Sequence, residues 1–315
     1  MIIVTGGSGK VGRATVRDLA AHGYGVLSLD LVRPPQSNPP GPADIAFSLC
    51  DITDFGEVMA AFSGVNDRLS GETVEGVVHL GAVPAPGLAQ DHVIFDTNIT
   101  STYNVFEAAR RLGIRNVVWA SSETVYGLPY GKGPKYVPVD EAIEAPETSY
   151  SLSKLLGEKM AEQYARWDRR TKIVGLRFSN VQEPQDYERF AGYQKDARLR
   201  AFNLWTYIDA RDAAQAVRRA LEARLTGAHV FGIANSNSLM ARDNDSLLDE
   251  VFPGTKRKRP LAANESLISI EKARKVLGYD PQHDWTPGKI RAPRNARKNP
   301  PGPVREALAR RAAKT

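Results

Sequence analysis

The chain has 315 residues, of which 42% are hydrophobic and 25% are charged, and its formal net charge is +6. This length and composition are typical of one large or two moderate globular domains, and no run of about 18 apolar residues predicts a membrane span. Cys50 is the only cysteine, which excludes intrachain disulfides and thiolate metal clusters. We therefore expect a cytoplasmic protein that binds no metal and no membrane.

The positive charge is concentrated at the C-terminus. Residues 289–315 contain nine Lys or Arg residues and one acidic residue, a net charge of +8, which leaves residues 1–288 with a net charge of −2. Because the rest of the chain is nearly neutral, the basic balance does not predict binding of nucleic acid. The tail is rich in proline and charge, so we predict a basic flexible extension there.

Apolar runs alternate with helical patterns from the first residues. Strands are predicted at residues 2–5, 25–30, 45–50, 76–80, 116–120 and 172–177. Helices are predicted between them, at residues 11–21, 55–62, 92–112 and 149–167. This order is typical of βαβ units, and strands that are apolar throughout are typical of a parallel sheet covered on both faces. We therefore predict an α/β fold with a doubly wound parallel sheet.

The pattern changes after residue 177. We predict an irregular segment at 178–204, a helix at 210–223, a strand at 230–233 and shorter elements up to residue 288. Residues 1–180 and 207–235 would then form a nucleotide-binding domain. Residues 181–206 and 236–288 would form a small C-terminal substrate lobe over the carboxyl ends of the strands, where such sheets bind ligands.

A glycine-rich turn, Thr5-Gly6-Gly7-Ser8-Gly9-Lys10-Val11-Gly12, follows the first strand and opens the first helix. Glycines there allow a tight turn and let backbone amides approach a pyrophosphate. The strand before the turn and the helix after it make a dinucleotide site the favoured interpretation. The predicted contacts are Gly6, Gly9, Lys10, Val11 and Gly12.

Asp30 lies at the end of the second predicted strand, eighteen residues after Gly12. A carboxylate at this position meets the ribose hydroxyls of adenosine and repels a 2′-phosphate. The sequence therefore favours NAD over NADP as the cofactor. Arg33 lies nearby and keeps NADP as the alternative.

Two further strand ends are candidate parts of the cofactor site. Asp51 and Ile52 follow the third strand, and Asp51 either contacts the adenine or caps the next helix. The fourth strand ends in His79-Leu80-Gly81-Ala82, where small residues would let the backbone lie flat against a cofactor. We predict cofactor contacts from Leu80, Gly81 and Ala82, and a hydrogen-bonded core position for His79.

Tyr150 and Lys154 are four residues apart, so they share one face of the predicted helix at 149–167. A phenol with a pKa of about 10 is a poor base at neutral pH. A nearby lysine ammonium and an oxidised nicotinamide would favour the phenolate. The pair therefore predicts a proton acceptor beside a hydride acceptor, which is the chemistry of alcohol oxidation.

These motifs, together with Thr97-Asn98-Ile99 and Ser121-Ser122-Glu123-Thr124-Val125-Tyr126-Gly127, occur in an order that resembles the extended short-chain dehydrogenase/reductase family. Within that family the chain is similar to the NAD-dependent epimerase/dehydratase group, over about residues 1–280. The resemblance implies a Rossmann domain and a homodimer that pairs through the helices bearing Asn98 and Tyr150.

The resemblance also implies residue roles. Tyr150 would be the catalytic acid/base, Lys154 would bind the nicotinamide ribose and lower the tyrosine pKa, and Ser122 would hydrogen-bond the reacting oxygen. Asn98 would lie on the helix behind the cofactor. Asn180 would lie near the nicotinamide and the substrate, and Glu123 would adjoin the substrate beside Ser122.

Departures from the family's pattern narrow the chemistry. Dehydratases of the family place an Asp-Glu pair after the Ser/Thr, whereas this chain has Glu123-Thr124, so dehydration is not expected. Only 26 residues separate Asn180 from Tyr207, so few residues are available there to bind a nucleoside diphosphate. A distant similarity to uronate dehydrogenases implies that Arg189 binds a sugar carboxylate, with Lys195, Arg198 and Arg200 as competitors for that role.

The first hypothesis is an NAD-dependent oxidoreductase that acts on a secondary alcohol or hemiacetal of a sugar or sugar acid. The second is a nucleotide-sugar 4-epimerase that retains its NAD. The third is a non-catalytic, NAD-responsive binding protein, which the complete Ser122, Tyr150 and Lys154 set argues against. The sequence does not name the substrate.

Overall fold

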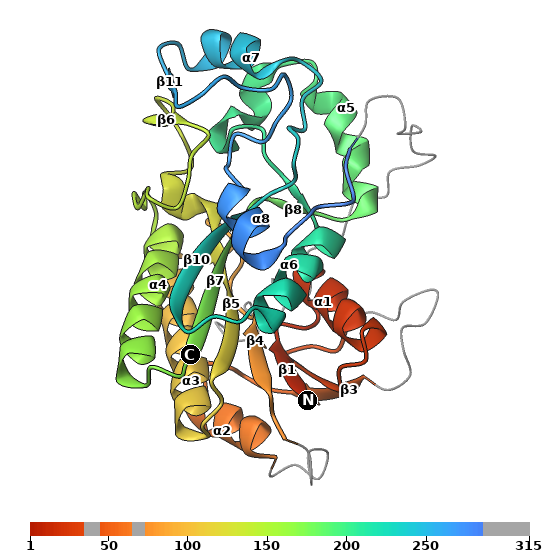
Figure 1. Ribbon diagram of the computed structural model, residues 1–315, viewed down its shortest axis with the longest axis vertical. Coiled ribbons are helices and arrows are strands. Elements are labelled where there is room, and N and C mark those ends of the chain that lie inside the picture. The colour runs from red at the N-terminus through yellow and green to blue at the C-terminus, as the bar shows by residue number, and fades with distance from the viewer. Residues whose placement is uncertain (35–44, 65–72, 286–315) are drawn as a thin grey trace.

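The computed structural model describes residues 1–34, 45–64 and 73–285. Within this part of the chain, seven parallel strands form one sheet in the order β10-β7-β5-β4-β1-β2-β3 (Figure 1). The predicted α/β fold with a doubly wound sheet is confirmed, while the predicted tail at 289–315 lies outside the described residues. The strands are β1 (Ile2–Thr5), β2 (Val26–Asp30), β3 (Ala46–Leu49), β4 (Gly76–His79), β5 (Asn116–Ser122), β7 (Lys172–Phe178) and β10 (Gly227–Ile233).

The sheet separates two apolar cores, because successive side chains of a strand point to opposite faces. Val4, Val78, Val118 and Val174 contribute to the core under α1 (Lys10–Ala21) and α6 (Ala210–Glu222). Their neighbours Ile3, Val77, Val117 and Ile173 contribute to the core under α2 (Phe55–Ser63), α3 (Asp91–Arg111) and α4 (Ser149–Trp167). In the described part of the chain, no helix has the length and apolarity needed to span a membrane.

The strand order reverses at β1, since the chain continues to β2 and β3 on one side and to β4, β5, β7 and β10 on the other. A crevice forms at the carboxyl ends of the strands beside such a switch point, and it is where open α/β sheets bind ligands. The glycine-rich turn, Asp30, His79 and Ser122 all lie at or directly after these strand ends. The topology therefore brings the predicted site residues to one edge of the sheet.

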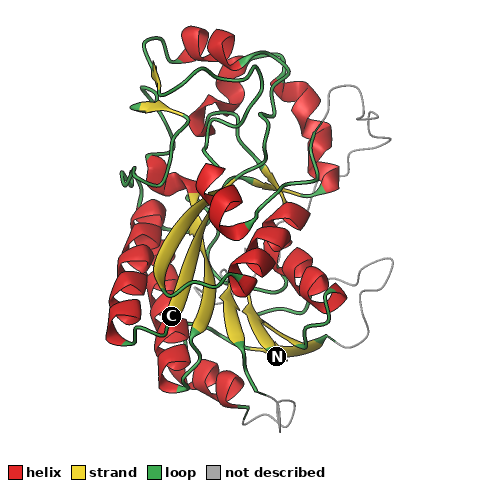
Figure 2. Ribbon diagram, viewed as in Figure 1, coloured by secondary structure: helices red, strands yellow, loops and turns green. Residues whose placement is uncertain are grey.

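A smaller lobe of short elements covers that edge (Figures 1 and 2). The expectation of an irregular segment at 178–204 is wrong, because the chain there forms short helices stabilised by buried side chains such as Phe190 and Ala201. The short elements are η2 (Glu123–Tyr126), β6 (Tyr136–Val137), β8 (Val181–Gln182), η3 (Pro184–Arg189), α5 (Phe190–Tyr193), η4 (Ala197–Asn203), β9 (Ile208–Asp209), α7 (Asn244–Val251), β11 (Lys256–Arg257) and α8 (Glu271–Leu277).

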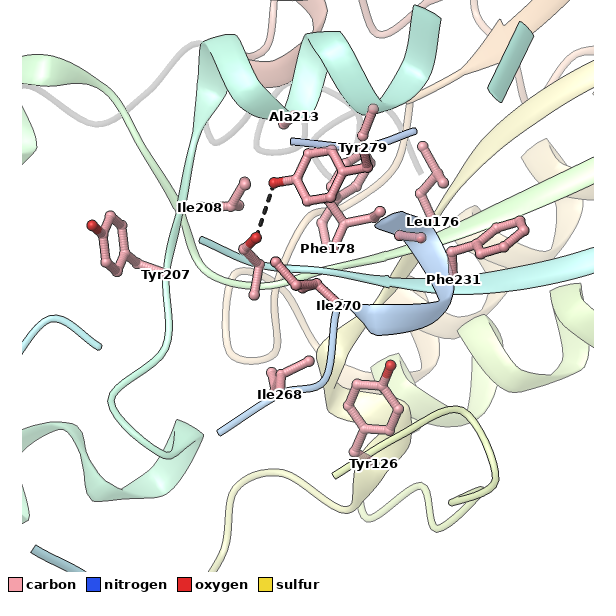
Figure 3. Packing of buried hydrophobic residues seen from close by; sticks show 14 of the residues in the cluster. Tyr126, Leu176, Phe178, Tyr207, Ile208, Ala213, Phe231, Ile268, Ile270 and Tyr279 are labelled. Atoms are coloured by element: carbon pink, nitrogen blue, oxygen red, sulfur yellow. Dashed lines mark hydrogen bonds between the residues drawn. The ribbon is translucent and has the colours of Figure 1, made fainter. Parts of the chain in front are cut away.

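The lobe and the sheet share one continuous core. Figure 3 shows Phe178 and Phe231 of the sheet packed near Tyr279, whose hydroxyl donates a hydrogen bond to the Ala234 carbonyl at 2.9 Å. Trp285 is also buried, and its backbone N–H donates to the Tyr207 hydroxyl at 2.8 Å. The chain after β10 therefore returns to cover the sheet. The proposed domain boundaries stay a prediction.

Candidate functional site

The turn after β1 brings backbone segments so close together that side chains do not fit between them. Gly6 has a φ of +71°, and a Cβ added to it would lie 2.4 Å from the Gly81 nitrogen. A Cβ on Gly12 would lie 2.1 Å from the Gly6 carbonyl oxygen. No side chain caps the first turn of α1, so its backbone amides face the crevice without a protein acceptor at the N-cap. This cradle fits the pyrophosphate of a dinucleotide.

Asp30 is held against the same turn. Its Oδ2 accepts a hydrogen bond from the Ser8 backbone N–H at 2.9 Å, and its Oδ1 accepts one from Leu31 at 2.7 Å. Burial raises the pKa of Asp30, and these hydrogen bonds oppose the rise. The Arg33 guanidinium lies 5.1 Å from the centre of the Phe47 ring, which it overlies. The carboxylate is thus at the tip of β2, where the ribose of an adenosine is expected.

The structure excludes one of the two interpretations of the segment after β3. Asp54 is the N-cap of α2, since its side chain accepts from the Glu57 backbone N–H. The alternative that Asp51 caps this helix is therefore wrong. Asp51 Oδ1 instead accepts from Thr53, and the Ile52 carbonyl accepts from Asn104 at 3.1 Å. The adenine contacts of Asp51 and Ile52 stay a prediction.

The end of β4 is fixed by the end of β1 and by α3. Leu80 and Gly81 both donate backbone hydrogen bonds to Thr5. The buried Asn98 amide holds the backbone just beyond Ala82, because it bonds both the N–H and the carbonyl of Val83, at 2.8 and 3.2 Å. Asn98 therefore fixes the backbone beyond β4 from α3, and its predicted place behind a cofactor stays a prediction.

His79 and Cys50 are core residues. The His79 ring lies 2.8 Å from the Thr5 hydroxyl, and its pKa is lowered to about 3 by burial and by Lys154. This confirms the predicted hydrogen-bonded core position. Cys50 is buried, and burial raises its thiol pKa to about 12, which keeps the thiol protonated and inert as expected.

Tyr150 and Lys154 lie one turn apart on α4, whose first turn is capped by reciprocal hydrogen bonds between Thr148 and Ser151. The Lys154 Nζ lies 5.7 Å from the centre of the Tyr150 ring and donates to the Ala120 carbonyl at 2.9 Å. Burial raises the pKa of Tyr150 to about 12, with the neighbouring Ser122 hydroxyl opposing the rise. Burial also lowers the pKa of Lys154 to about 8. The protein's own groups alone therefore do not make this phenol acidic.

Ser122 is the last residue of β5, and its hydroxyl oxygen is directed by the next turn. The Thr124 backbone N–H and hydroxyl donate to Ser122 Oγ at 3.2 and 3.0 Å. The Ser122 hydroxyl lies close enough to Tyr150 on α4 to affect its pKa. Ser122, Tyr150 and Lys154 are thus brought together as the sequence predicts. The supporting role of Thr124 was missed, although its place two residues after Ser122 is a signal for such a turn.

A buried ion pair sets the position of α4 against the sheet. The Arg177 guanidinium of β7 donates to both carboxylate oxygens of Glu158 on α4, at 2.8 and 2.7 Å, and both side chains are almost fully buried. Ser121, beside Ser122 on β5, donates to the same carboxylate at 2.5 Å. This network aligns the helix that carries Tyr150 with the strand that carries Ser122. Sequence reasoning missed it, because it joins residues from three elements.

The predicted substrate residues have different surroundings. Asn180 is exposed just beyond the end of β7, beside the strand end that carries Ser122. Arg189 is 57% exposed on η3 and lies 3.8 Å from Asp186. Lys195 and Arg198 are also exposed. Glu123 is buried, and its carboxyl group faces the protein segment after η4. The substrate roles of these residues stay predictions.

Arg200 differs from the other candidate arginines. It is 8% exposed, and its Nη2 donates to Asn180 Oδ1 at 3.2 Å. The rings of Tyr193 and Phe202 lie 5.4 and 5.0 Å from its guanidinium carbon. Its Nε has no hydrogen-bond partner, and within residues 1–34, 45–64 and 73–285 no carboxylate forms an ion pair with it. A buried cation of this kind is suited to an anionic ligand.

Two ion pairs connect the glycine-rich turn to the substrate lobe. The Lys10 Nζ lies 2.5 Å from Asp186 Oδ2, and an Arg13 nitrogen lies 2.7 Å from Glu183 Oε1. Arg13 also donates to the Ser8 carbonyl. The lobe segment η3 is therefore fastened to the first turn of α1. The backbone contact of Lys10 with a cofactor stays a prediction.

Comparison with known proteins agrees with this geometry. The model of a family described as "NAD dependent epimerase/dehydratase family" matches residues 2–234. The chain is 33% identical to a putative UDP-glucose 4-epimerase of Methanocaldococcus jannaschii, over 61% of this chain and 60% of that protein. It is 30% identical to an L-arabinose 1-dehydrogenase (NAD(P)(+)) of Haloferax volcanii, over 71% of this chain and 83% of that protein.

Solved structures show the same fold at lower identity. A short-chain dehydrogenase/reductase superfamily protein from Agrobacterium tumefaciens, solved with bound NAD, has a TM-score of 0.65 and 24% identity, with 91% of this chain and 93% of that chain covered. A UDP-glucose 4-epimerase from Thermotoga maritima, solved with UDP-glucose, has a TM-score of 0.65 and 23% identity, with 90% and 94% covered.

Proposed function

Because the chain belongs to the NAD-dependent epimerase/dehydratase family, whose cofactor is NAD, we propose that it is an oxidoreductase acting on a secondary alcohol or hemiacetal of a sugar or sugar acid. The observation that carries the proposal is the grouping of Ser122, Tyr150 and Lys154 at the carboxyl edge of the sheet. The cradle at Gly6 and Gly12 and the carboxylate of Asp30 fit the pyrophosphate and the adenosine ribose.

In the proposed mechanism Tyr150 takes the proton of the substrate hydroxyl. Ser122 orients that hydroxyl by donating its own proton, because the Thr124 N–H and hydroxyl fill both acceptor sites of Ser122 Oγ. Lys154 contributes its positive charge from one helical turn away. When bound, oxidised NAD supplies an acceptor for the hydride of the alcohol carbon and a second positive charge near the phenol. Since burial raises the pKa of Tyr150, we expect turnover to depend on this added charge.

Arg200 supports a sugar acid as the substrate class. Its buried guanidinium donates a hydrogen bond to Asn180. Asn180 follows two residues after Phe178, which pairs with Ser122 across β5 and β7. An anionic group bound beside the guanidinium would supply an opposite charge to this buried cation. Arg189, the earlier candidate for this contact, is largely exposed and paired with Asp186. We therefore assign the proposed carboxylate contact to Arg200.

The alternative is a nucleotide-sugar 4-epimerase that retains its NAD. It is supported by the likeness to proteins described as UDP-glucose 4-epimerases. The short segment between Asn180 and Tyr207 supports the oxidoreductase instead, since it offers few residues for a nucleoside diphosphate.

A substrate screen distinguishes the two functions. Free sugars, uronic acids and nucleotide sugars are each incubated with the protein and NAD, and NADH absorbance is recorded. The proposal expects net NADH formation with a free sugar or uronic acid. Tightly retained NAD, with interconversion of a nucleotide sugar and no net NADH, would instead establish the epimerase.

We also propose that two copies of the chain pair through α3 and α4. Tyr103, Leu152 and Leu156 are large apolar side chains that these helices expose. A Leu156→Glu variant should then sediment as a monomer where the unmodified chain sediments as a dimer. Unchanged sedimentation of the variant would contradict this arrangement.

A further inference from the structure

Glu123 is a buried carboxyl group at the meeting point of the two parts of the site. It follows Ser122 directly, begins η2 and is 6% exposed. Its Oε1 accepts a hydrogen bond from the Asn203 amide at 3.2 Å, and its Oε2 lies 3.0 Å from the Thr206 hydroxyl oxygen. Both partners belong to the substrate segment. The side chain therefore joins the catalytic strand end to that segment.

The Thr206 hydroxyl has two acceptors within reach and only one proton to donate. The Thr206 hydroxyl oxygen also lies 2.7 Å from the Asn203 carbonyl, which can only accept. A hydroxyl has a single proton, and we assign it to the Asn203 carbonyl because that contact is shorter than the one to Glu123. The two amide protons of Asn203 are directed to Glu123 and to the Thr206 carbonyl. The contact between Thr206 and Oε2 is therefore a hydrogen bond only if the carboxyl group carries the proton.

The same contacts hold an unusual turn. Leu204 and Trp205, between Asn203 and Thr206, have φ values of 56° and 54°, and both side chains are fully buried. Bulky residues avoid this left-handed conformation, so surrounding contacts have to maintain it. The Trp205 backbone N–H in turn donates to the Arg200 carbonyl. The turn thus connects Glu123 to the position of Arg200.

We propose that Glu123 is a neutral carboxylic acid in mildly acidic solution, that it ionises as the pH rises through neutrality, and that its proton holds the 203–206 turn, and with it Arg200, in the substrate-binding position. On ionisation the proton leaves to solvent and the Oε2 contact with Thr206 becomes a contact between two acceptors. The new carboxylate also attracts the Arg200 guanidinium and competes with an anionic substrate for it. Glu123 is therefore a positioning residue that makes substrate affinity depend on pH.

The charged and titratable groups around Glu123 agree with a proton that is lost near neutrality. Burial raises the pKa of Glu123 to about 7, against the opposing effects of its hydrogen bonds and of Arg200. Tyr130 and Tyr150 face it as well, and the Glu123 carboxylate raises the pKa of both phenols. Ionised Glu123 would therefore also make Tyr150 a less ready proton acceptor.

The test compares Glu123→Gln with Glu123→Ala, with Glu162→Gln on the exposed surface of α4 as the matched control. Glutamine reproduces the protonated acid, because its oxygen accepts from Asn203 and its amide donates to Thr206. The kinetic part rests on the proposed function. We expect the substrate KM of the wild type and of the control to rise several-fold between pH 6.5 and pH 8, while the KM of Glu123→Gln stays constant. Glu123→Ala should have a raised KM at every pH.

Two measurements are independent of activity. The infrared difference spectrum of wild type minus Glu123→Gln should contain a protonated carboxyl band at pH 6 that disappears by pH 8. Since the folded-state pKa is raised, the unfolded chain ionises first, so the wild-type free energy of unfolding should fall between about pH 4.5 and about pH 7 more than that of Glu123→Gln. A missing acid band at pH 6, or a Glu123→Gln variant as impaired as Glu123→Ala at pH 6.5, would overturn the proposal. Absence of turnover with every substrate would affect only the proposed function.

Discussion

The glycine-rich turn at residues 6–12 and the turn at residues 203–206 both contain left-handed backbone, and they maintain it in different ways. At Gly6 the conformation is intrinsic, since glycine adopts a positive φ without steric penalty. Leu204 and Trp205 adopt it only because buried contacts with Glu123 and the core hold them. The cofactor turn is thus defined by local sequence, whereas the substrate turn depends on distant residues. Substitutions should therefore separate cofactor binding from substrate binding.

The largest effect is expected for Tyr150→Phe, which belongs to neither turn. Removing the phenolic oxygen removes the proposed proton acceptor, and such groups contribute about 10²- to 10⁴-fold to turnover. The NAD dissociation constant, measured by calorimetry, should stay within about twofold of wild type, because the substitution leaves both turns intact. A conservative Tyr24→Phe change, just before β2 and beside Glu222, serves as the control. If the Tyr150→Phe variant turned over at the wild-type rate, the proposed mechanism would be wrong.

A smaller loss, in NAD affinity, is expected for Gly12→Ala. The new Cβ would lie 2.1 Å from the Gly6 carbonyl oxygen, so the backbone has to shift. Overpacking of this kind costs about 1–3 kcal/mol, which corresponds to roughly 5- to 150-fold in the NAD dissociation constant. Gly131→Ala is the matched control, since a Cβ there meets open space. Equal affinities of the two variants would show that the turn does not hold the cofactor.

Arg200→Gln tests the substrate turn at residues 203–206, which positions this arginine. Loss of a hydrogen bond to a charged group costs about 1.5–3 kcal/mol, so the KM for a sugar acid should rise about tenfold or more. NAD affinity and the KM for a neutral sugar should not change. The matched Arg189→Gln variant, altered at an exposed arginine, should behave as wild type. The reverse pattern would return the carboxylate contact to Arg189.

The smallest effect is expected for Asp186→Asn, which weakens the link between the two regions. The Lys10 partner is 42% exposed, and solvent-screened ion pairs contribute about 0.2–1 kcal/mol. Thermal unfolding should therefore shift by a few degrees at most, with NAD affinity changed by less than about fivefold. A much larger loss of NAD affinity would mean that the position of η3 controls the cofactor turn.

The parts of the molecule that the sequence predicts are those defined by local pattern. Apolar runs identify the parallel strands, and the four-residue spacing places Tyr150 and Lys154 on one helical face. Asp30 is recognisable because its distance from Gly12 is set by one βαβ unit. In each case the physical cause lies within a short stretch of chain.

The remainder depends on contacts between distant segments. Nothing local distinguishes Arg200 from Arg189, and only the fold shows that one is buried beside Asn180 and the other exposed. The sequence also offered Asp51 as the possible cap of α2, and only the fold shows that Asp54 caps this helix. The short helices of the substrate segment were missed because buried side chains from other elements stabilise them.

The return of the chain through Tyr279 and Trp285 has a consequence for shortened versions of the protein. The family match ends at residue 234, yet Ile268, Ile270 and Tyr279 cover apolar side chains of β7 and β10. A protein truncated at residue 234 would expose that surface to water and leave the Tyr207 hydroxyl without the Trp285 N–H. We expect such a fragment to aggregate, so the smallest autonomously folding unit extends at least to Trp285.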